Sequence, residues 1–563
     1  MRISKNLHWL VCILFFISCA RQSSPTGGPK DTIPPKLITT VPGQEAINFK
    51  GQQIELVFSE MIILNNPKEQ LIITPTVGKD FDLKIKKNTI ILDLDKPLED
   101  NTTYTFNFRE AVQDITEKNP AKSLQLAFST GPYIDSISIS GNVFDLIKNV
   151  EAKEATVAIY HQGDTFNLLK HPATYFSKST QKGAYKIEHL KPGIYFIYAF
   201  EDKNRNLILD TKNESYGFLA SPIHLTKDTS KVSVAMLKLD ARPLKLTNAR
   251  PYNTYFNIRT SKNVKAFTIK ARDNKDIYYS YGPDQSNIQV YNTFKDQDSV
   301  ALSLNATDSI GNTIDTLLYA KFQTREVEPE KFKVSLKEAT IIASKALLEA
   351  SYSFTKPLKE VNFDSLYFQV DSLTNVPINK EDLTYDETLK TLTIKKKLDR
   401  TLFKAPDEDP DTTPAKKDTS STPELKRLHI LYSGKGSFLS VEGDSSQAIE
   451  KSIQPLKASD LSQIEFQLRI NHPHFIVQLL DKEFTIISQI ANQKKGIFAD
   501  LPAGDYQLRV VIDRNQNGVW DAGNIIKREE PEPIIYSKDD SKSQIIKLRA
   551  NYEIVLPILL ITS

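Results

Sequence analysis

Apolar and polar residues alternate with a period of two along most of this chain. The pattern is clear in QIELVF at 53–58, TIILDL at 89–94, TYTFNF at 103–108 and YQLRV at 506–510. Side chains on a strand point alternately to opposite faces, so this period is typical of strands with one buried face. Turn residues follow at intervals of about ten, and the best amphipathic helical fragment is only 345–350. We therefore predict an all-β fold of tandem sandwiches.

The chain also repeats itself, which indicates several domains built on shared plans. LKPGIY at 190–195 returns as LPAGDY at 501–506, and DKNRN at 202–206 returns as DRNQN at 513–517, both with an offset of 311 residues. A second pair, 194 residues apart, aligns DITEKN at 114–119 with DSIGNT at 308–313. A weaker echo aligns FSEM at 58–61 with FTKP at 354–357.

Two of these patterns resemble known domains. The L-x-x-G-x-Y phrase resembles the small transthyretin-like or carboxypeptidase-regulatory-like β-sandwich, in which the glycine makes a tight turn before the next strand. Residues 34–131, with VFSE at 57–60 and LEDNTTY at 98–104, closely resemble the bacterial Ig-like domain. The whole order, including the opening PTGGPKDTIPP, is similar to an Ig-like-domain lipoprotein family of the Bacteroidetes. The resemblance is strong over the first 240 residues and the last hundred, and weaker between them.

These patterns divide the chain into consecutive segments. We predict a lipoprotein signal peptide at 1–18, a flexible tether at 19–35, an Ig-like domain at 36–131 and a transthyretin-like sandwich at 132–240. A degenerate Ig-like domain at 241–328, a third Ig-like domain at 329–455 and a second transthyretin-like sandwich at 456–563 complete the chain. Inside the third Ig-like domain, residues 405–424 are charged, proline-rich and free of large apolar residues, so we expect a disordered insertion there.

The N-terminus has the order of a bacterial export signal. Basic residues at positions 2 and 5 precede an apolar stretch at 9–17, which is too short to cross a bilayer as a stable helix. FISC at 16–19 resembles the bacterial lipobox, although the family usually has leucine at the place of Phe16. We expect cleavage before Cys19 and an N-terminal lipid on that residue. The alternative is an ordinary signal peptide with an incidental cysteine.

Composition excludes several chemistries. The only two cysteines, Cys12 and Cys19, lie at or before the expected cleavage site, so the mature body has none for a disulfide, a thiolate nucleophile or a zinc site. The 72 basic and 69 acidic residues give a net charge of +3 and are spread evenly, so nothing indicates a nucleic-acid partner.

The D-x-N-x-N loops are the strongest chemical motif. Calcium prefers oxygen ligands, and alternate residues of a tight loop can direct theirs at one centre. Gly518 fits the sharp turn of the second loop, whereas Leu207 departs from it in the first, and Asn213 and Asn524 stand where an EF-hand has its final glutamate. The alternative is a solvated turn closed by Asn and Asp side chains. The candidate ligands are Asp202, Asn204, Asn206 and Asp210 in the first loop, and Asp513, Asn515, Asn517 and Asp521 in the second.

Catalytic constellations are scarce. Of the eight histidines only His472 and His474 are close in sequence, and the proline between them makes a poor metal pair. No G-x-S-x-G, H-E-x-x-H or glycine-rich phosphate loop occurs. The carboxylates of Glu60 and Asp114 fall at repeat positions of an Ig-like frame, where edge and turn roles suffice.

These features favour a non-enzymatic lipoprotein, anchored in a membrane, that acts as a β-sandwich scaffold or binding module for an envelope protein or cell-wall partner. The alternative is a carbohydrate-binding accessory lipoprotein of an outer-membrane uptake system. Tyr278, Tyr279 and Tyr281 would stack on sugars in that case, and are otherwise ordinary strand residues. RQSS at 21–24 lacks the acidic cluster that resembles a surface-export signal, which favours the periplasmic face of the outer membrane.

Overall fold

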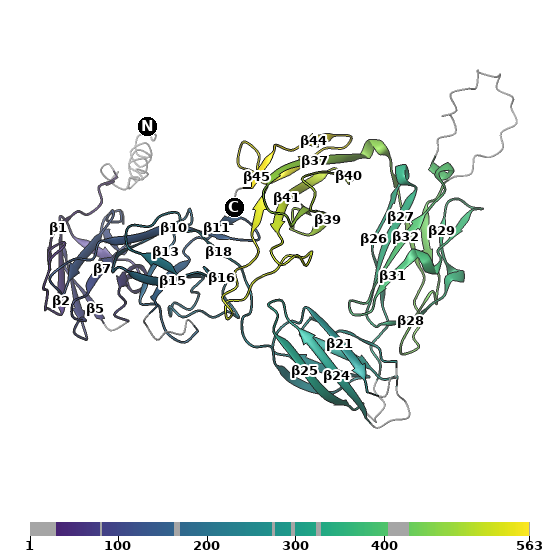
Figure 1. Cartoon of the computed structure of the whole chain (residues 1–563), viewed down its shortest axis with the longest axis horizontal. Helices are drawn as coiled ribbons and strands as arrows, with labels where there is room; N and C mark the ends of the chain where they lie inside the picture. Colours follow the sequence, from purple (N-terminus) through teal and green to yellow (C-terminus); the bar gives the residue numbers. More distant parts are fainter. Residues whose placement is uncertain are drawn as a thin grey trace, which may run out of the picture.

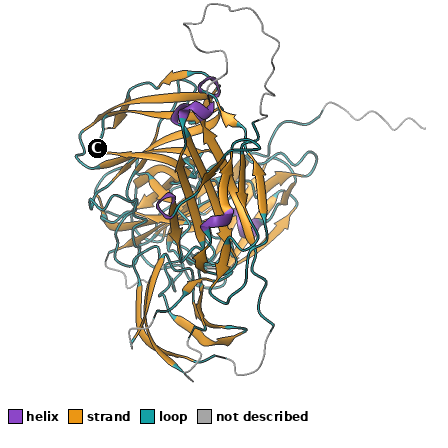
Figure 2. Cartoon of the chain, turned by 90° about the vertical axis from the view of Figure 1, so that its right-hand side faces the viewer, coloured by secondary structure: helices purple, strands orange, loops and turns teal. Residues whose placement is uncertain are grey.

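A computed structural model describes residues 30–78, 81–162, 169–272, 276–293, 299–322, 328–403 and 427–561. The predicted signal peptide, the lipidation residue Cys19 and the expected insertion at 405–424 lie outside the described residues. The chain is 49% strand and 4% helix, and Figure 2 shows strands joined by loops, with a few short helices among them. The prediction of an all-β fold of tandem sandwiches is confirmed.

Unit 1 spans residues 37–129. Its elements are β1 (Leu37–Val41), β2 (Gln53–Phe58), β3 (Ile62–Leu64), α2 (Pro67–Gln70), β4 (Ile72–Thr74), β5 (Phe81–Lys86), β6 (Thr89–Leu94), β7 (Thr103–Asn107), β8 (Val112–Asp114) and β9 (Gln125–Ser129). The sheets β1-β2-β6-β5 and β4-β7-β9 face each other across one core, and β3 pairs with β8. The period of two places Ile54, Leu56 and Phe58 in that core, each with no exposed surface.

Unit 2 spans residues 137–236. Its strands are β10 (Ile137–Asp145), β11 (Val150–Glu151), β12 (Thr156–His161), β13 (Tyr175–Lys178), β14 (Ala184–Leu190), β15 (Gly193–Phe200), β16 (Tyr216–Phe218), β17 (Ile223–Leu225) and β18 (Val234–Met236). One sheet has the order β11-β10-β14, with β18 also on β10. The other has the order β13-β12-β15-β16, with β17 also on β15.

Unit 3 spans residues 246–320. Its strands are β19 (Leu246–Tyr252), β20 (Tyr255–Thr260), β21 (Ala266–Ala271), β22 (Tyr279–Tyr281), β23 (Asn287–Tyr291), β24 (Val300–Thr307) and β25 (Thr313–Ala320). The sheets β19-β20-β23-β22 and β21-β24-β25 enclose a core of aliphatic and aromatic side chains.

Unit 4 spans residues 334–456. Its elements are β26 (Val334–Ile342), η1 (Ala343–Lys345), β27 (Leu347–Phe354), β28 (Leu358–Val361), η2 (Phe363–Ser365), β29 (Leu366–Gln369), β30 (Asn375–Pro377), η3 (Lys380–Asp382), β31 (Leu383–Asp386), β32 (Thr391–Lys397), η4 (Arg400–Phe403), β33 (Ile430–Ser433), β34 (Phe438–Ser440), β35 (Ile449–Ser452) and β36 (Pro455–Leu456). The fragment 345–350, the best helical pattern in the sequence, mostly forms the start of β27, where alternate side chains are buried. The main sheets are β31-β32-β27-β26-β36 and β30-β29-β33-β35.

Unit 5 follows η5 (Ala458–Asp460) and repeats the plan of unit 2. Its strands are β37 (Leu461–Ile470), β38 (Phe475–Asp481), β39 (Ile486–Ala491), β40 (Lys495–Pro502), β41 (Gly504–Ile512), β42 (Ile534–Tyr536), β43 (Ile546–Leu548), β44 (Glu553–Val555) and β45 (Leu559–Ile561). The sheet β39-β38-β41-β42, with β43 also on β41, has the same order as the second sheet of unit 2.

The tyrosine of the L-x-x-G-x-Y phrase makes the same hydrogen bond in units 2 and 5. The Tyr195 hydroxyl donates to the carbonyl of Lys191 at 3.0 Å, and the Tyr506 hydroxyl donates to the carbonyl of Pro502 at 2.9 Å. The expectation that the glycine makes the tight turn is wrong, because each glycine is the first residue of its strand, β15 or β41. The left-handed residue instead precedes the leucine: φ is 59° at His189 and 57° at Asp500.

Units 2 to 5 form a closed arrangement rather than an open string, and unit 1 lies outside it (Figure 1). Unit 1 lies beside unit 2, with the N–H of Thr76 donating to the carbonyl of Thr174 at 2.7 Å. Units 3 and 4 meet where the N–H of Tyr281 donates to the carbonyl of Thr388 at 2.9 Å. Unit 5 lies between unit 4 and unit 2 and touches both, so units 2 to 5 make a ring.

Candidate functional site

Loop 1, residues 202–214, joins β15 to β16 and contains the first D-x-N-x-N motif. The Asp202 carboxylate accepts hydrogen bonds from the N–H groups of Asn206 at 3.0 Å and Leu207 at 3.2 Å. The side-chain oxygen of Asn204 also accepts from the N–H of Asn206, at 3.3 Å. Asp210 caps the next turn by accepting from the N–H of residue 212 at 3.0 Å. These oxygens converge on the backbone of one tight loop.

Loop 2, residues 513–532, joins β41 to β42 and repeats this geometry. The Asp513 carboxylate accepts from the N–H groups of Asn517 at 3.1 Å and Gly518 at 2.9 Å. The side-chain amides of Asn515 and Asn517 both donate to the same oxygen of Asp521, at 2.7 Å each. The four predicted ligand residues are therefore brought together in loop 2 more tightly than in loop 1.

A buried glutamate closes the base of each loop, and sequence reasoning did not find it. Glu214 is 1% exposed and accepts from the N–H groups of loop positions 2 and 9, at 3.0 and 2.9 Å. Glu532 is 4% exposed and accepts from the same two positions, at 2.6 and 3.1 Å. Glu214 stands four residues after Asp210, whereas Glu532 stands eleven after Asp521, so loop 2 is seven residues longer. This difference in spacing hid the equivalence in the sequence.

The departure at position 6 changes the residue but not the backbone. Gly518 has a φ of 76° and Leu207 has a φ of 60°, so both lie in the left-handed region. A leucine adopts that region only at a cost that glycine avoids. Loop 2 therefore has the less strained version of the turn.

The donor chemistry of the loops fits a hard cation in part. The side-chain oxygens of Asp513 and Asn515 lie together in loop 2, where both accept from the N–H of Asn517, and a calcium ligand set needs such convergent oxygens. Glu532, however, spends both carboxylate oxygens on backbone N–H groups. Burial raises the pKa of Glu214 in loop 1, the two backbone hydrogen bonds that it accepts oppose this rise, and the charges of Asp202 and Asp210 add to it. The structure thus holds each loop by its own hydrogen bonds, and calcium binding stays a prediction.

One group of three carboxylates in the described part of the chain is close enough to share a metal ion. Asp31, Glu60 and Asp114 each have an oxygen within 4.8 Å of the others. Burial opposes the charge of Asp114, but hydrogen bonds from three backbone N–H groups and the amide of Asn119 outweigh it and lower its pKa. Asp114 therefore has the turn role that its repeat position indicated. Burial and the charges of Asp114 and Asp31 raise the pKa of Glu60.

Units 3 and 4 have a lysine where unit 1 has Glu60. In each of the three units a Ser or Thr comes directly before this residue. Its hydroxyl accepts a hydrogen bond, at 2.9–3.0 Å, from the N–H of the residue that precedes the first strand of the unit. Lys262 lies 2.5 Å from the Asp308 carboxylate, and Lys356 lies 2.7 Å from the Asp444 carboxylate. Both lysine side chains are buried. An ammonium group thus faces the acidic turn in units 3 and 4, where Lys356 also pairs with Glu442, and Glu60 places a third carboxylate there in unit 1.

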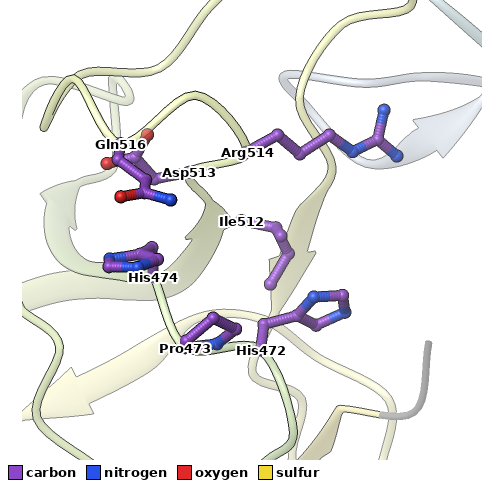
Figure 3. Close-up of a pocket in the computed structure, with 7 residues that line it drawn as sticks. All are labelled: His472, Pro473, His474, Ile512, Asp513, Arg514 and Gln516. Atoms are coloured by element: carbon purple, nitrogen blue, oxygen red, sulfur yellow. The ribbon is translucent and has the colours of Figure 1, made fainter.

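A small pocket lies under the start of loop 2 (Figure 3). His472, Pro473 and His474 line it together with Asp513 and the side chains beside it. Its volume of about 220 Å³ is below the roughly 300 Å³ at which small-molecule sites begin. Figure 3 shows the two histidine rings on opposite sides of Pro473, so they do not form a metal pair.

The three tyrosines considered for sugar stacking belong to the fold of unit 3. Tyr281 is 8% exposed and donates its hydroxyl to the carbonyl of Val264 at 3.0 Å. Its ring and that of Tyr279 both pack against Phe267, with centroids 4.9 and 5.5 Å away. Tyr278 is half-buried. These residues do not present an exposed aromatic platform.

No helix in the described ranges is long and apolar enough to cross a membrane.

Comparison with known proteins identifies one domain. The family model of the bacterial Ig-like domain matches residues 31–130, which correspond to unit 1. A search of curated proteins gave no match. Among solved structures, the major pilin subunit BcpA of Bacillus cereus is 11% identical, covering 76% of this chain and 99% of the pilin, with a TM-score of 0.13. Surface layer protein SbsC, domains 1–6, is 10% identical, covering 92% of this chain and 68% of that one, with a TM-score of 0.14. These low scores carry no argument about function.

Proposed function

We propose that this protein is a non-enzymatic envelope lipoprotein, anchored by a lipid on Cys19, that acts as a β-sandwich scaffold or binding module for a protein or cell-wall partner. Its placement is the outer membrane, on the periplasmic face. The observation that carries the proposal is a lipobox-like FISC followed by a tether and then by five sandwich units, the first of which matches the bacterial Ig-like domain.

The roles of the polar residues support a structural rather than a catalytic function. Asp114, Glu214 and Glu532 all spend their carboxylate oxygens on backbone N–H groups of turns. A general acid or base needs a free oxygen within reach of a substrate. In the described residues, the pocket under loop 2 is small and its histidines face apart.

Calcium belongs to this proposal as a structural ion. Loop 2 would hold it through Asp513, Asn515, Asn517 and Asp521, and loop 1 through Asp202, Asn204, Asn206 and Asp210. Support comes from the convergence of the oxygens of Asp513 and Asn515 on one N–H, at 3.1 and 3.2 Å, and from the left-handed glycine. Bound calcium would stiffen each loop.

The anchor is tested by labelling cells with an alkyne-bearing fatty acid and isolating the protein. We expect the parent chain and Cys12→Ser to carry the label and to sediment with membranes, because acyl chains supply about 0.8 kcal/mol per buried methylene. Cys19→Ser should lose the label and leave the membrane fraction. Labelling of Cys19→Ser at the parental level would contradict the proposal. In-cell crosslinking of the labelled parent then identifies the partner.

A further inference from the structure

Loop 2 has ten residues between Asp521 and Glu532, whereas loop 1 has three between Asp210 and Glu214. These ten residues, 522–531, here named the tip, form a separate hairpin. Asn524 and Glu529 exchange backbone hydrogen bonds of 2.7 and 2.9 Å, and the Asn524 side chain caps the turn between them. Gly523 has a φ of 67°, and a Cβ atom there would lie 2.3 Å from the carbonyl oxygen of Glu529. The hairpin therefore has a defined shape that requires glycine at this position.

The tip leaves its own unit and inserts its apolar side chain elsewhere. Ile525 is 7% exposed because it joins the hydrophobic cluster of unit 2 that contains Tyr198, and Ile310 of unit 3 belongs to the same cluster. The side-chain amide of Asn524 donates to the carbonyl of Ile310 at 3.0 Å. One hairpin of unit 5 thus contacts units 2 and 3 together.

Polar groups fix the orientation of the tip on unit 2. The guanidinium of Arg528 lies over the ring of Phe196, 3.7 Å from its centroid, in cation–π geometry. Glu530 accepts a hydrogen bond from the N–H of Ala220 at 2.7 Å. Outside the tip, Gln544 donates to the carbonyl of Lys148 at 3.0 Å, and the Tyr536 hydroxyl donates to the carbonyl of Ile147. An apolar anchor surrounded by oriented polar contacts is the arrangement of a specific interface.

We propose that the tip is an intramolecular latch, and that docking of the tip on unit 2 converts a string of units into the closed ring. Units 2 and 5 have no direct chain connection, so only noncovalent contacts hold them together. Because both partners belong to one chain, the closing step benefits from a high effective concentration and needs no large interface. Opening would free units 3 to 5 to move relative to unit 2. This inference concerns the shape of the body and does not depend on the lipid anchor.

The test uses the soluble body from Ala20 onwards, which has no cysteine. Lys182 of unit 2 and Lys494 of unit 5 are exposed, so Lys182→Cys and Lys494→Cys accept a pair of spin labels for a pulsed dipolar distance measurement. We expect one narrow distance distribution. Ile525→Asp should broaden it, whereas the matched control Ile526→Asp should leave it unchanged, because Ile526 is 63% exposed.

A second, milder variant distinguishes loss of docking from misfolding. Arg528→Ala removes the contact with Phe196 but leaves the aliphatic anchor, and should broaden the distribution less than Ile525→Asp does. Circular dichroism and amide protection of β41 should match the parent in both variants. A narrow, parental distribution in Ile525→Asp would overturn the latch, as would a broad distribution in the parent. A narrow peak that appears only with dimer formation would show that the tip docks on a second copy, which also overturns it.

Discussion

Loops 1 and 2 share a base but differ in reach. Both begin with an aspartate that binds two backbone N–H groups and end on a buried glutamate that binds two more. Loop 1 turns back directly, and it reaches beyond its own unit through the ion pair of Arg205 with Glu69 of unit 1. Loop 2 inserts the tip before its glutamate and so reaches units 2 and 3.

This difference separates two properties of the same motif. The hydrogen bonds of the base hold the loop in its own sandwich, and they are the same in both copies. The reach of the loop depends on what is inserted above the base, at no cost to those bonds. A duplicated turn can therefore gain an interdomain contact by insertion alone.

The largest effect should follow removal of the base. Glu532→Ala removes the acceptor of two part-buried backbone N–H groups, those of residues 514 and 521, so we expect unit 5 to lose roughly 1–3 kcal/mol in total. Glu214→Ala should destabilise unit 2 by a similar amount. Hydrogen exchange should then show faster exchange around each mutated loop. Only Glu532→Ala should also deprotect residues 219–220 of unit 2, the strand end that the tip contacts. Equal exchange in the two variants at 219–220 would remove the distinction between the loops.

A smaller effect should come from calcium. Loop 2 has the glycine turn and the tighter set of oxygens. The melting temperature of unit 5, which contains loop 2, should therefore rise in millimolar calcium. A ligand at a hundredfold excess over its dissociation constant stabilises by about 2.7 kcal/mol. Asp513→Ala should abolish most of the response and Asp202→Ala little of it. If calorimetry of the parent detects no binding heat, both loops are turns closed by their own side chains.

The smallest effect concerns the three Ig-like positions occupied by Glu60, Lys262 and Lys356. Glu60→Lys should stabilise unit 1 by at most about 1 kcal/mol, as expected for a partly exposed ion pair with Asp114. The pKa of Glu60 is raised in the fold, so the folded state binds more protons and unit 1 loses stability as pH rises through that range. Glu60→Lys should abolish this part of the pH dependence in thermal melts. Unchanged melting across pH 4–7 in both proteins would show that the three carboxylates do not interact.

The sequence predicted the class of fold because its information is local. The period of two in QIELVF places Ile54, Leu56 and Phe58 inward, and the structure buries all three. The offset of 311 residues predicted that units 2 and 5 share a plan, and their sheets have the same order. The aspartates and asparagines of both loops were found for the same reason.

The closing glutamates and the tip could not be found in this way. Glu532 follows a seven-residue insertion, so a fixed offset does not align it with Glu214. Ile525 stands in a mostly polar loop, and nothing near it in sequence reveals that it joins the cluster that contains Tyr198 and Ile310. Burial that depends on residues hundreds of positions away is a property of the assembled chain.

The most direct test of the account is small-angle X-ray scattering of the soluble body, with and without the tip. The variant without the tip has residues 522–531 replaced by the sequence Thr-Lys-Asn, which loop 1 has at the equivalent place, residues 211–213. We expect the parent to scatter as the closed ring of Figure 1 and the variant, with the same circular dichroism, to have a larger radius of gyration. Equal radii for the two proteins, or a parent that scatters as an extended string of units, would contradict it.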